Sequence, residues 1–483
     1  MKSPVIVWLR HDLRLADNPA LYYAAQSGRV IPVFIDDTTT ADHCNLGAAS
    51  RCWLHHSLAH LNDQLSDQLR IFQGDPLAIL LALIQHTGAQ TIHWNRCYTP
   101  HAITRDSQIK QALKSTGTTV HSYNGSLLWE PWTITKADGT PYKVFTPYYR
   151  KGCISAPPPS EPLPRPTLEL YSDDLTTQLA ANDVQPCDLT ELNLLPNHPW
   201  HHRLTDHWEI TEAAAWQRLQ RFTNERLENY PQGRDYPALE ATSTLSPYLQ
   251  WGQISPRQIW YYSQQQGSHP GLEEQLDTFL KELAWREFSY YQLYHNPNIT
   301  TENLNPRFNR FPWKNQPEQC HQWQQGMTGF PIIDAGMREL WQTGYMHNRV
   351  RMLVASFLVK NQCQHWHLGA TWFWDTLVDA DLASNSASWQ WVAGCGSDAA
   401  PYFRIFNPVL QGQKFDAEGD YIRRFIPELS ALPSRYIHTP WEASAAVLAE
   451  AGVQLGTTYP KPMLDLKASR QAALDAFASL KQQ

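Results

Sequence analysis

The first 125 residues alternate between short apolar segments and longer amphipathic ones, and this alternation limits the folds available to the chain. Short apolar segments are typical of buried strands, and the amphipathic stretches between them are long enough for helical crossovers. The pattern therefore predicts an α/β domain with a doubly wound parallel sheet. The expected strands are Val5–Arg10, Val30–Asp37, Leu69–Gln73, Thr91–Asn95 and Thr118–Tyr123, and the expected helices cover 18–27, 48–67, 76–87 and 101–116.

Sheets of this kind bind ligands beyond the carboxyl ends of their strands. A dinucleotide-binding sheet carries a G-x-G-x-x-G run after its first strand, whereas this chain has Trp8-Leu-Arg-His-Asp-Leu-Arg14 there. The sequence thus argues against an NAD site. A sheet edge that binds no ligand remains an alternative.

The pattern changes after about residue 130. The Pro-rich run 155–166 excludes a helix or a central strand, so residues 131–200 are expected to form an irregular connector between an α/β domain (1–130) and an all-α domain (201–483). An all-α domain builds its ligand site among facing helices. Helices are expected at Glu212–Asn229, Gly271–Tyr294, Pro317–Gln325, Ala335–Leu340, Asn348–Lys360 and Ala370–Leu377.

Composition excludes several classes of protein. A chain of 483 residues is long for one core, so two or three domains are expected. The net charge of −7 means that any contact with nucleic acid must rest on a local basic face. The eight cysteines form no CxxC pair, which favours reduced thiols over a disulfide frame or a metal site. No signal peptide or apolar run of membrane-spanning length is found, so a cytoplasmic location is expected.

The stretch 379–408 combines carboxylates, an amide and tryptophans within a short distance. Asn385 and Trp389 are spaced i, i+4 and share one face of the expected helix. Trp389 and Trp391 then point in nearly opposite directions, one inward and one outward. Spacing alone favours an aromatic-rich helical core.

This stretch, with Met346-His-Asn-Arg-Val-Arg-Met352 and Glu282-Leu-Ala-Trp-Arg-Glu-Phe288, resembles the flavin-binding half of the DNA photolyase/cryptochrome family. More narrowly, it resembles class I cyclobutane pyrimidine dimer photolyases. The resemblance begins at residues 8–21 and ends near Leu429, which leaves the C-terminal tail outside it. It implies a deoxyribodipyrimidine photo-lyase that binds FAD and UV-damaged DNA and needs no obligate protein partner and no metal.

The resemblance implies three groups of flavin contacts. Hydroxyls of the run 242–246 would donate to the diphosphate at a helix start, although an ordinary Ser/Thr helix cap is the alternative. Arg351 with its acids would lie beside the ring, and the Asn385 amide would face N5. Plant cryptochromes tend to have Asp at this place and animal ones Cys, so Asn favours repair. The implied cofactor-binding residues are Tyr230, Thr242, Ser243, Thr244, Leu245, Ser246, Arg351, Asp379, Ala380, Asp381 and Asn385.

In the implied chemistry, reduced flavin excited by light passes one electron to the dimer, which splits and returns it. A buried Glu282 that keeps its proton would hydrogen-bond the negative pyrimidine carbonyls. The dimer pairs poorly and would flip out of the duplex, as photolyase substrates do. The implied catalytic residues are Glu282, Trp285, Met352, Asn385 and Trp391. The implied DNA-binding residues are Arg234, Glu282, Trp285, Asn348, Arg349, Met352, Trp391, Gln411 and Lys414.

Met352 favours the cyclobutane dimer, because relatives that repair (6-4) photoproducts tend to carry a second histidine there. A cryptochrome-type blue-light photoreceptor and, less favoured, a (6-4) photolyase remain the alternatives. Trp313, Trp366 and Trp389 align with the family's electron relay to the flavin. A second, antenna chromophore is expected in the N-terminal domain. A deazaflavin type is favoured over folate, because His101 and Ala102 replace the Asn-Glu pair of folate-binding members.

Overall fold

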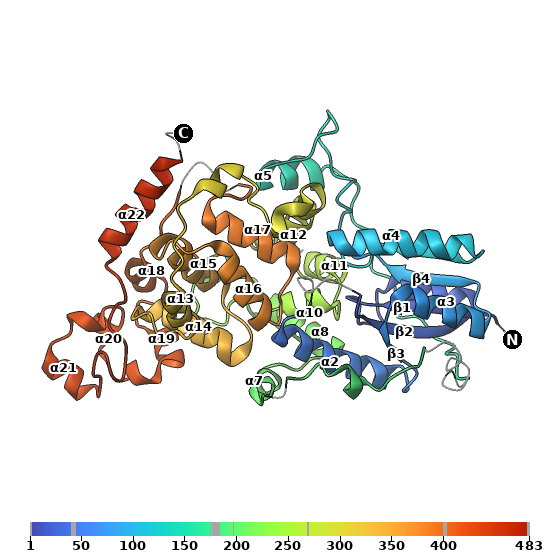
Figure 1. Ribbon diagram of the computed structural model, residues 1–483, viewed down its shortest axis with the longest axis horizontal. Helices are drawn as coiled ribbons and strands as arrows, with labels where there is room; N and C mark the ends of the chain where they lie inside the picture. The colour runs from blue at the N-terminus through green and yellow to red at the C-terminus, as the bar shows by residue number, and fades with distance from the viewer. Residues whose placement is uncertain are drawn as a thin grey trace. The chain divides into compact units, whose positions relative to one another are not determined.

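A computed structural model describes residues 2–39, 45–173, 175, 184–196, 198–267, 270–398 and 403–480. The chain forms two compact units (Figure 1). Unit 1 comprises 1–142, 146–225 and 243–294, and unit 2 comprises 143–145, 226–242 and 295–483. These units group residues by their contacts and do not follow the expected bounds 1–130, 131–200 and 201–483, which stay a prediction.

Unit 1 contains the expected doubly wound sheet. Its strands are β1 (Pro4–Leu9), β2 (Arg29–Asp37), β3 (Arg70–Gly74), β4 (Thr91–Asn95) and β5 (Thr119–Tyr123), in the order β3-β2-β1-β4-β5. Every neighbouring pair is parallel, and Ile6 of β1 lies opposite Ile31 on one side and Ile92 on the other. The strand order reverses at β1, so the predicted fold class is confirmed.

The sequence sets the ends of the crossover helices. The helix α1 (Pro19–Ser27) begins after Asn18, whose side chain accepts from the backbone N–H of Leu21. The helix α3 (Pro76–Thr87) begins after Asp75 in the same way and ends at Gly88, which has a φ of 70°. Together with α2 (Ala48–Gln64) and α4 (Pro100–Ser115), they lie within a few residues of their predicted positions.

The rest of unit 1 is irregular or helical. Residues 157–169 form neither helix nor strand, as the prolines predict. A π-helical turn at Tyr148–Cys153 lies in the expected connector. The further helices are α7 (Trp200–His207), α8 (Glu212–Glu225), α10 (Ser246–Trp251), α11 (Pro256–Gln266) and α12 (Glu273–His295), of which α7, α10 and α11 were not predicted.

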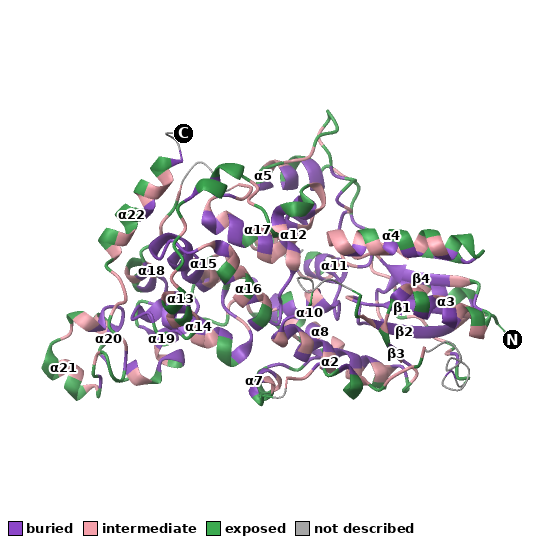
Figure 2. Cartoon of the chain, in the orientation of Figure 1, coloured by how far each residue is buried: buried purple, intermediate pink, exposed green. Residues whose placement is uncertain are grey.

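Unit 2 is helical around one apolar core (Figure 2). The helix α14 (Pro331–Thr343) packs against α15 (Asn348–Ser356), α18 (Pro408–Phe415) and α19 (Asp420–Phe425), and α16 (Trp366–Thr376) packs against α17 (Leu382–Ala393). The expected helix Asn348–Lys360 is not continuous, because α15 ends at Ser356 and a π-helical turn, Phe357–Asn361, follows it. The other α-helices of this unit, within the described residues, are α9 (Tyr230–Gly233), α13 (Pro317–Gln324), α20 (Ser434–Ile437), α21 (Ala445–Glu450) and α22 (Leu466–Ser479).

The C-terminal tail is part of this core. Tyr459 is buried and donates its hydroxyl to Asp334 at 2.7 Å, and the backbone N–H of Met463 donates to the carbonyl of Thr328 at 3.0 Å. The short α21 and the terminal α22 are mostly exposed (Figure 2). None of the helices described is both long and apolar enough to cross a membrane.

Candidate functional site

The turn between α14 and α15 positions the arginines that the sequence singles out. The helix α14 ends at Gly344, whose φ of 68° lies in the left-handed region that glycine adopts without strain. His347 then caps α15, because its Nδ1 accepts from the backbone N–H of Arg349 at 3.2 Å. Burial lowers the pKa of His347 to about 4, so its ring is neutral and can accept this hydrogen bond.

Arg351, on the first turn of α15, contacts three groups. Its Nη2 donates to Asp379 Oδ2 at 2.9 Å, its Nε donates to the carbonyl of Met346 at 2.7 Å, and the guanidinium lies 5.0 Å from the centre of the Tyr345 ring. Burial opposes the charge, but the Asp379 carboxylate and Tyr345 outweigh it and raise the pKa of Arg351. The predicted Arg351–Asp379 pair is therefore present, and its orientation is fixed.

The helix α17 carries the acid, the amide and two of the tryptophans. Asp381 caps it, because its carboxylate accepts from the backbone N–H of Ser384 at 2.6 Å, and Ala380 before it is buried. Asn385 Nδ2 donates to the carbonyl of Ala370 on α16 at 3.0 Å. This contact leaves the side-chain oxygen of Asn385 as the group able to accept a hydrogen bond from a ligand.

The hydroxyl run 242–246 contributes to both units. Thr242 of unit 2 shares a side-chain hydrogen bond with Tyr345, so it belongs to the Arg351 group. In unit 1, Thr244 has a φ of 51°, and its Oγ1 accepts from Arg218 at 2.7 Å. No side chain caps α10, which starts at Ser246. The alternative of an ordinary Ser/Thr helix cap is therefore wrong here.

The remaining members of this predicted set lie close by in the sequence. Ser243 is half-buried, Leu245 is buried, and Ser246 is exposed. Tyr230 is buried at the start of α9 (Tyr230–Gly233).

The three tryptophans predicted to form an electron relay are all in unit 2. Trp313 lies 5.1 Å from the His365 ring, and His365 lies 5.8 Å from Trp366, so the imidazole bridges these two indoles. Trp389 is buried and packs closely on α16, because a Cβ at Gly369 would lie only 2.0 Å from its ring. Trp391 is half-buried at the edge of the core. The predicted opposite orientation of the two tryptophans of α17 is consistent with these burial levels.

Three of the predicted DNA-contacting cations flank two aromatic rings in unit 2. Arg349 lies 4.5 Å from the centre of the Phe415 ring and pairs with Asp235 at 2.7 Å. Lys414 lies 5.0 Å from the same ring, and Arg234 lies 5.3 Å from the Tyr230 ring. Asn348 is exposed, whereas Met352 and Gln411 are half-buried. The contacts of Phe415 and Asp235 with Arg349 were not predicted, because Arg349 is distant from both in the sequence.

Two of the residues predicted to face the lesion lie in unit 1, and one of them differs from expectation. Glu282 on α12 is half-buried and not fully buried, and Trp285, one helical turn further, packs edge-on against Phe288. The buried carboxyl of this helix is Glu287, which accepts from the backbone N–H groups of Leu128 and Trp129. Burial raises the pKa of Glu287 to about 7. The prediction of a buried Glu282 is therefore wrong; the buried acid of α12 is Glu287, whose hydrogen bonds give it a structural role.

The side chains around Arg351 fit FAD by their chemistry. The half-buried guanidinium and the Asp379 carboxylate offer a donor and an acceptor, and Asn385 offers an uncharged acceptor oxygen held in place by Ala370. An isoalloxazine edge carries both kinds of hydrogen-bonding group. Thr242 and Tyr345 extend the polar surface of the same unit.

The motif after β1 is occupied by contacts within unit 1. Arg10 donates to Asp106 at 2.6 Å, and Asn95 donates to Asp12 at 2.6 Å, all in buried positions. These contacts fill the carboxyl ends of β1 and β4 with protein side chains. Next to them on α4, Ala102 is buried and His101 is half-buried.

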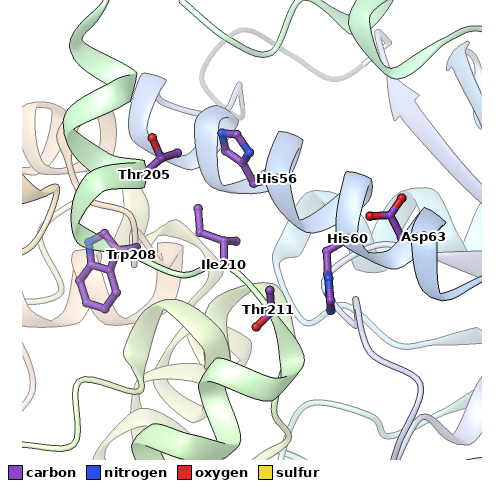
Figure 3. A pocket seen from close by; sticks show the side chains of 7 residues that line it. All are labelled: His56, His60, Asp63, Thr205, Trp208, Ile210 and Thr211. Carbon is purple, nitrogen blue, oxygen red and sulfur yellow. The ribbon is translucent and has the colours of Figure 1, made fainter.

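Unit 1 also has a pocket of about 320 Å³ that contains none of the predicted residues (Figure 3). Its walls are α2 and the segment formed by the end of α7 and the chain that follows it; Figure 3 shows His56, His60 and Asp63 on the first and Thr205, Trp208, Ile210 and Thr211 on the second. The lining residues are His56, His60, Asp63, Thr205, Trp208, Ile210 and Thr211. Within the described residues, no cluster of three or more His, Cys, Asp or Glu is arranged to hold a metal ion.

Comparison with known proteins identifies two family domains. Residues 5–167 match the model of DNA photolyase, and residues 279–479 match the model of the FAD-binding domain of DNA photolyase. The second match extends well beyond Leu429, so the expectation that the family resemblance ends there is wrong.

Individual relatives match over nearly the whole chain. A deoxyribodipyrimidine photo-lyase of Agrobacterium fabrum is 46% identical, with 99% of this chain and 98% of the relative covered. Cryptochrome-2 of Arabidopsis thaliana is 38% identical, with 99% and 79% covered. The crystal structure of a bacterial class III photolyase from Agrobacterium tumefaciens superimposes with a TM-score of 0.94 at 45% identity, covering 100% of this chain and 98% of that one. The expected class I assignment is not confirmed, and this similarity argues against it.

Proposed function

This chain belongs to the DNA photolyase/cryptochrome family, and we propose that it repairs cyclobutane pyrimidine dimers in DNA by light-driven electron transfer from reduced FAD. When bound, FAD supplies one electron that returns after the dimer has split, so the reaction needs no external oxidant or reductant in each turnover. With DNA as the substrate, the cytoplasmic location expected from the sequence is part of the proposal. The similarity to the Agrobacterium tumefaciens enzyme favours class III over class I.

The observation that carries the proposal is the orientation of Asn385. One N–H of its amide donates to the carbonyl of Ala370 and so orients the side chain, and the amide oxygen is the atom that can accept from a ligand N–H. An amide oxygen offers this hydrogen bond without placing a negative charge beside an anionic ring. An aspartate at the same place would add that charge and disfavour the fully reduced, anionic flavin.

The other chain residues have roles that follow from their positions. Arg351 and Asp379 would bind the ring edge, with Asp381 and Ala380 following on the same segment. Tyr230, Thr242, Ser243, Thr244, Leu245 and Ser246 would contact the remainder of the cofactor. Trp313, Trp366 and Trp389 would carry electrons to oxidised flavin.

The substrate contacts are proposed in the same way. Trp285 and Trp391 would stack on the two bases, Met352 would supply an apolar contact, and Glu282 would hydrogen-bond a base. Arg234, Asn348, Arg349, Gln411 and Lys414 would contact phosphates or the surroundings of the extruded dimer. The half-buried position of Glu282 leaves it accessible to a ligand, which the buried Glu287 is not.

A second chromophore of the deazaflavin type remains part of the proposal. Its support is that Ala102 is buried and that neither His101 nor Ala102 provides the acidic group of the folate-type motif. The absorption spectrum of chromophores extracted from purified protein tests this directly. A folate spectrum would contradict it without affecting the repair assignment.

A blue-light photoreceptor is the second candidate, because a plant cryptochrome is 38% identical over nearly the whole chain. The discriminating experiment mixes reduced protein with an oligonucleotide that contains one thymine dimer, in blue light and in the dark, and measures intact thymines by chromatography. We expect repair only in the light. If blue light restores no thymines although the protein retains FAD, the result would favour the photoreceptor.

The same assay tests the role of Asn385 through Asn385→Asp. This variant is expected to retain FAD and lose most of the repair, because the added charge disfavours reduced flavin. Asn298→Asp is the matched control, since Asn298 is an exposed residue of the same unit. Full repair by Asn385→Asp would refute the argument from the amide.

A further inference from the structure

One peptide group, between Met346 and His347, is hydrogen-bonded on both of its sides. Its N–H donates to Glu339 Oε2 at 3.2 Å, and its carbonyl oxygen accepts from Arg351 Nε at 2.7 Å. A trans peptide is a rigid plane, so its N–H and C=O point in opposite directions. The position of the Glu339 carboxylate therefore fixes the direction of the carbonyl that receives Arg351.

Glu339 is itself held from the other side. Tyr421 of α19 donates its hydroxyl to the same Oε2 at 2.5 Å. Burial raises the pKa of Tyr421 well above its ordinary value, so the phenol stays protonated and remains a donor. Tyr421 is anchored in turn, because its backbone N–H donates to Asp416 at 2.9 Å. A continuous chain of hydrogen bonds thus runs from α19 through Glu339 of α14 and Arg351 to Asp379. Hydrogen bonds linked in this way polarise one another.

We propose that Glu339 is a positioning residue for Arg351, acting through the Met346–His347 peptide to hold the guanidinium between Asp379 and the Met346 carbonyl. Glu339 touches no reacting group and lies one peptide away from the arginine. The consequence for the cofactor rests on the proposed function, in which Arg351 binds FAD. The effect on the Met346–His347 peptide does not rest on the proposed function, since this peptide can be observed in protein without FAD.

The hydrogen bonds that Glu339 accepts also depend on whether its carboxyl group is charged. Burial raises the pKa of Glu339 to about 7, and the hydrogen bonds from Tyr421 and His347 and the charges of Arg351 and Arg424 only partly oppose this. Tyr345 is the other titratable group that faces it. Both hydrogen bonds end on Oε2, so a proton on the other oxygen preserves their geometry and removes only the charge assistance.

Two substitutions separate geometry from charge. Glu339→Gln keeps an oxygen acceptor without the charge and resembles the protonated acid, whereas Glu339→Ala removes the acceptor. Glu450→Ala, at an exposed position on α21 of the same unit, is the control. Amide hydrogen exchange in protein stripped of FAD reports on the His347 N–H directly. Tyr421→Phe, which removes one donor to Oε2, serves as a second test if the alanine variant does not fold.

In Glu339→Ala we expect about tenfold faster exchange at His347 and about tenfold weaker FAD binding, the scale of one lost hydrogen bond to a charged group. Glu339→Gln should stay within about threefold for both. The His347 N–H exchanges at a rate that depends on pH even in an unfolded chain, and its protection is measured relative to that rate. In the natural protein this protection should rise from pH 6 to pH 8, and the rise should vanish in Glu339→Gln.

Wild-type protection of His347 in Glu339→Ala would overturn the proposal. Lost protection with unchanged FAD affinity would refute the positioning role of Glu339. Failure of the natural protein to bind FAD would instead refute the proposed function, and the exchange result obtained without cofactor would still stand.

Discussion

Replacing Lys360 by methionine should stabilise the protein, because the structure buries this lysine without a salt bridge in the described part of the chain. Lys360 lies in the π-helical turn after α15 and is 1% exposed. Its ammonium lies 3.2 Å from the centre of the Phe403 ring. Burial lowers the pKa of Lys360 to about 7, and the nearby Cys395 and Cys363 thiols offset this only in part.

The sign and size of the contribution of Lys360 to the free energy of unfolding follow from its protonation in the folded and in the unfolded chain. The unfolded chain titrates near 10.5 and the folded one near 7, so the unfolded state binds more protons between these values. Stability attributable to Lys360 therefore rises with pH through this window and is lowest below pH 7. The difference between the two pKa values of Lys360 corresponds to about 5 kcal/mol of unfolding free energy. The cation–π contact contributes about 0.5–2 kcal/mol in the opposite direction, so desolvation dominates.

Urea unfolding of Lys360→Met and the natural protein at pH 6.5 and pH 9 tests this reasoning. At pH 6.5 we expect the variant to be more stable by about 2–4 kcal/mol, since methionine fills the space of the stem without a charge. Its advantage over the natural protein should narrow by about 2–3 kcal/mol at pH 9, where the lysine of the folded protein is neutral. Lys467→Met, at an exposed position on α22, is the control. A variant that is less stable by the same amount at both pH values would refute the argument.

Three other substitutions test packing and charge. Gly369→Ala should destabilise the protein by about 1–3 kcal/mol and slow the photoreduction of oxidised flavin, because the new methyl group displaces the Trp389 ring; thermal unfolding and flash spectroscopy measure both, and an unchanged photoreduction rate would contradict the relay role. Arg349→Ala and Lys414→Ala should each reduce the salt dependence of DNA binding by about one unit of slope, as lost phosphate contacts do. Affinity measured from low to high salt checks this, and an unchanged slope would contradict it.

The fold could be predicted because its signals are local. Apolar runs, capping residues such as Asn18 and Asp75, and glycine stops such as Gly88 act within a few residues of the ends they define. The π-helical turn after Ser356 had no such signal, since no proline or glycine interrupts the helical pattern there. The integration of the C-terminal tail was also invisible, because the contact of Tyr459 with Asp334 joins residues 125 positions apart.

The site was predictable only in part for the same reason. Sequence motifs identified Arg351 and Asp379, which the structure pairs. They could not decide which glutamate of α12 is buried. Glu282 and Glu287 lie five positions apart on one helix, and the burial of Glu287 depends on the backbone of Leu128 and Trp129, more than 150 residues away. A sequence motif identifies the residue types at a site, but the burial of each side chain depends on packing against residues that are distant in the sequence.

The close packing of α16 on α17 couples two properties that motifs treat separately. Gly369 allows the Trp389 ring to approach α16, and the next residue, Ala370, offers the carbonyl that orients Asn385. Asn385 and Trp389 are one turn apart on the same face of α17, so neither can be moved without moving the other. A side chain at Gly369 should therefore disturb the amide as well as the indole. The missing Cβ at Gly369 is thus a condition for the amide geometry on which the proposed repair chemistry depends.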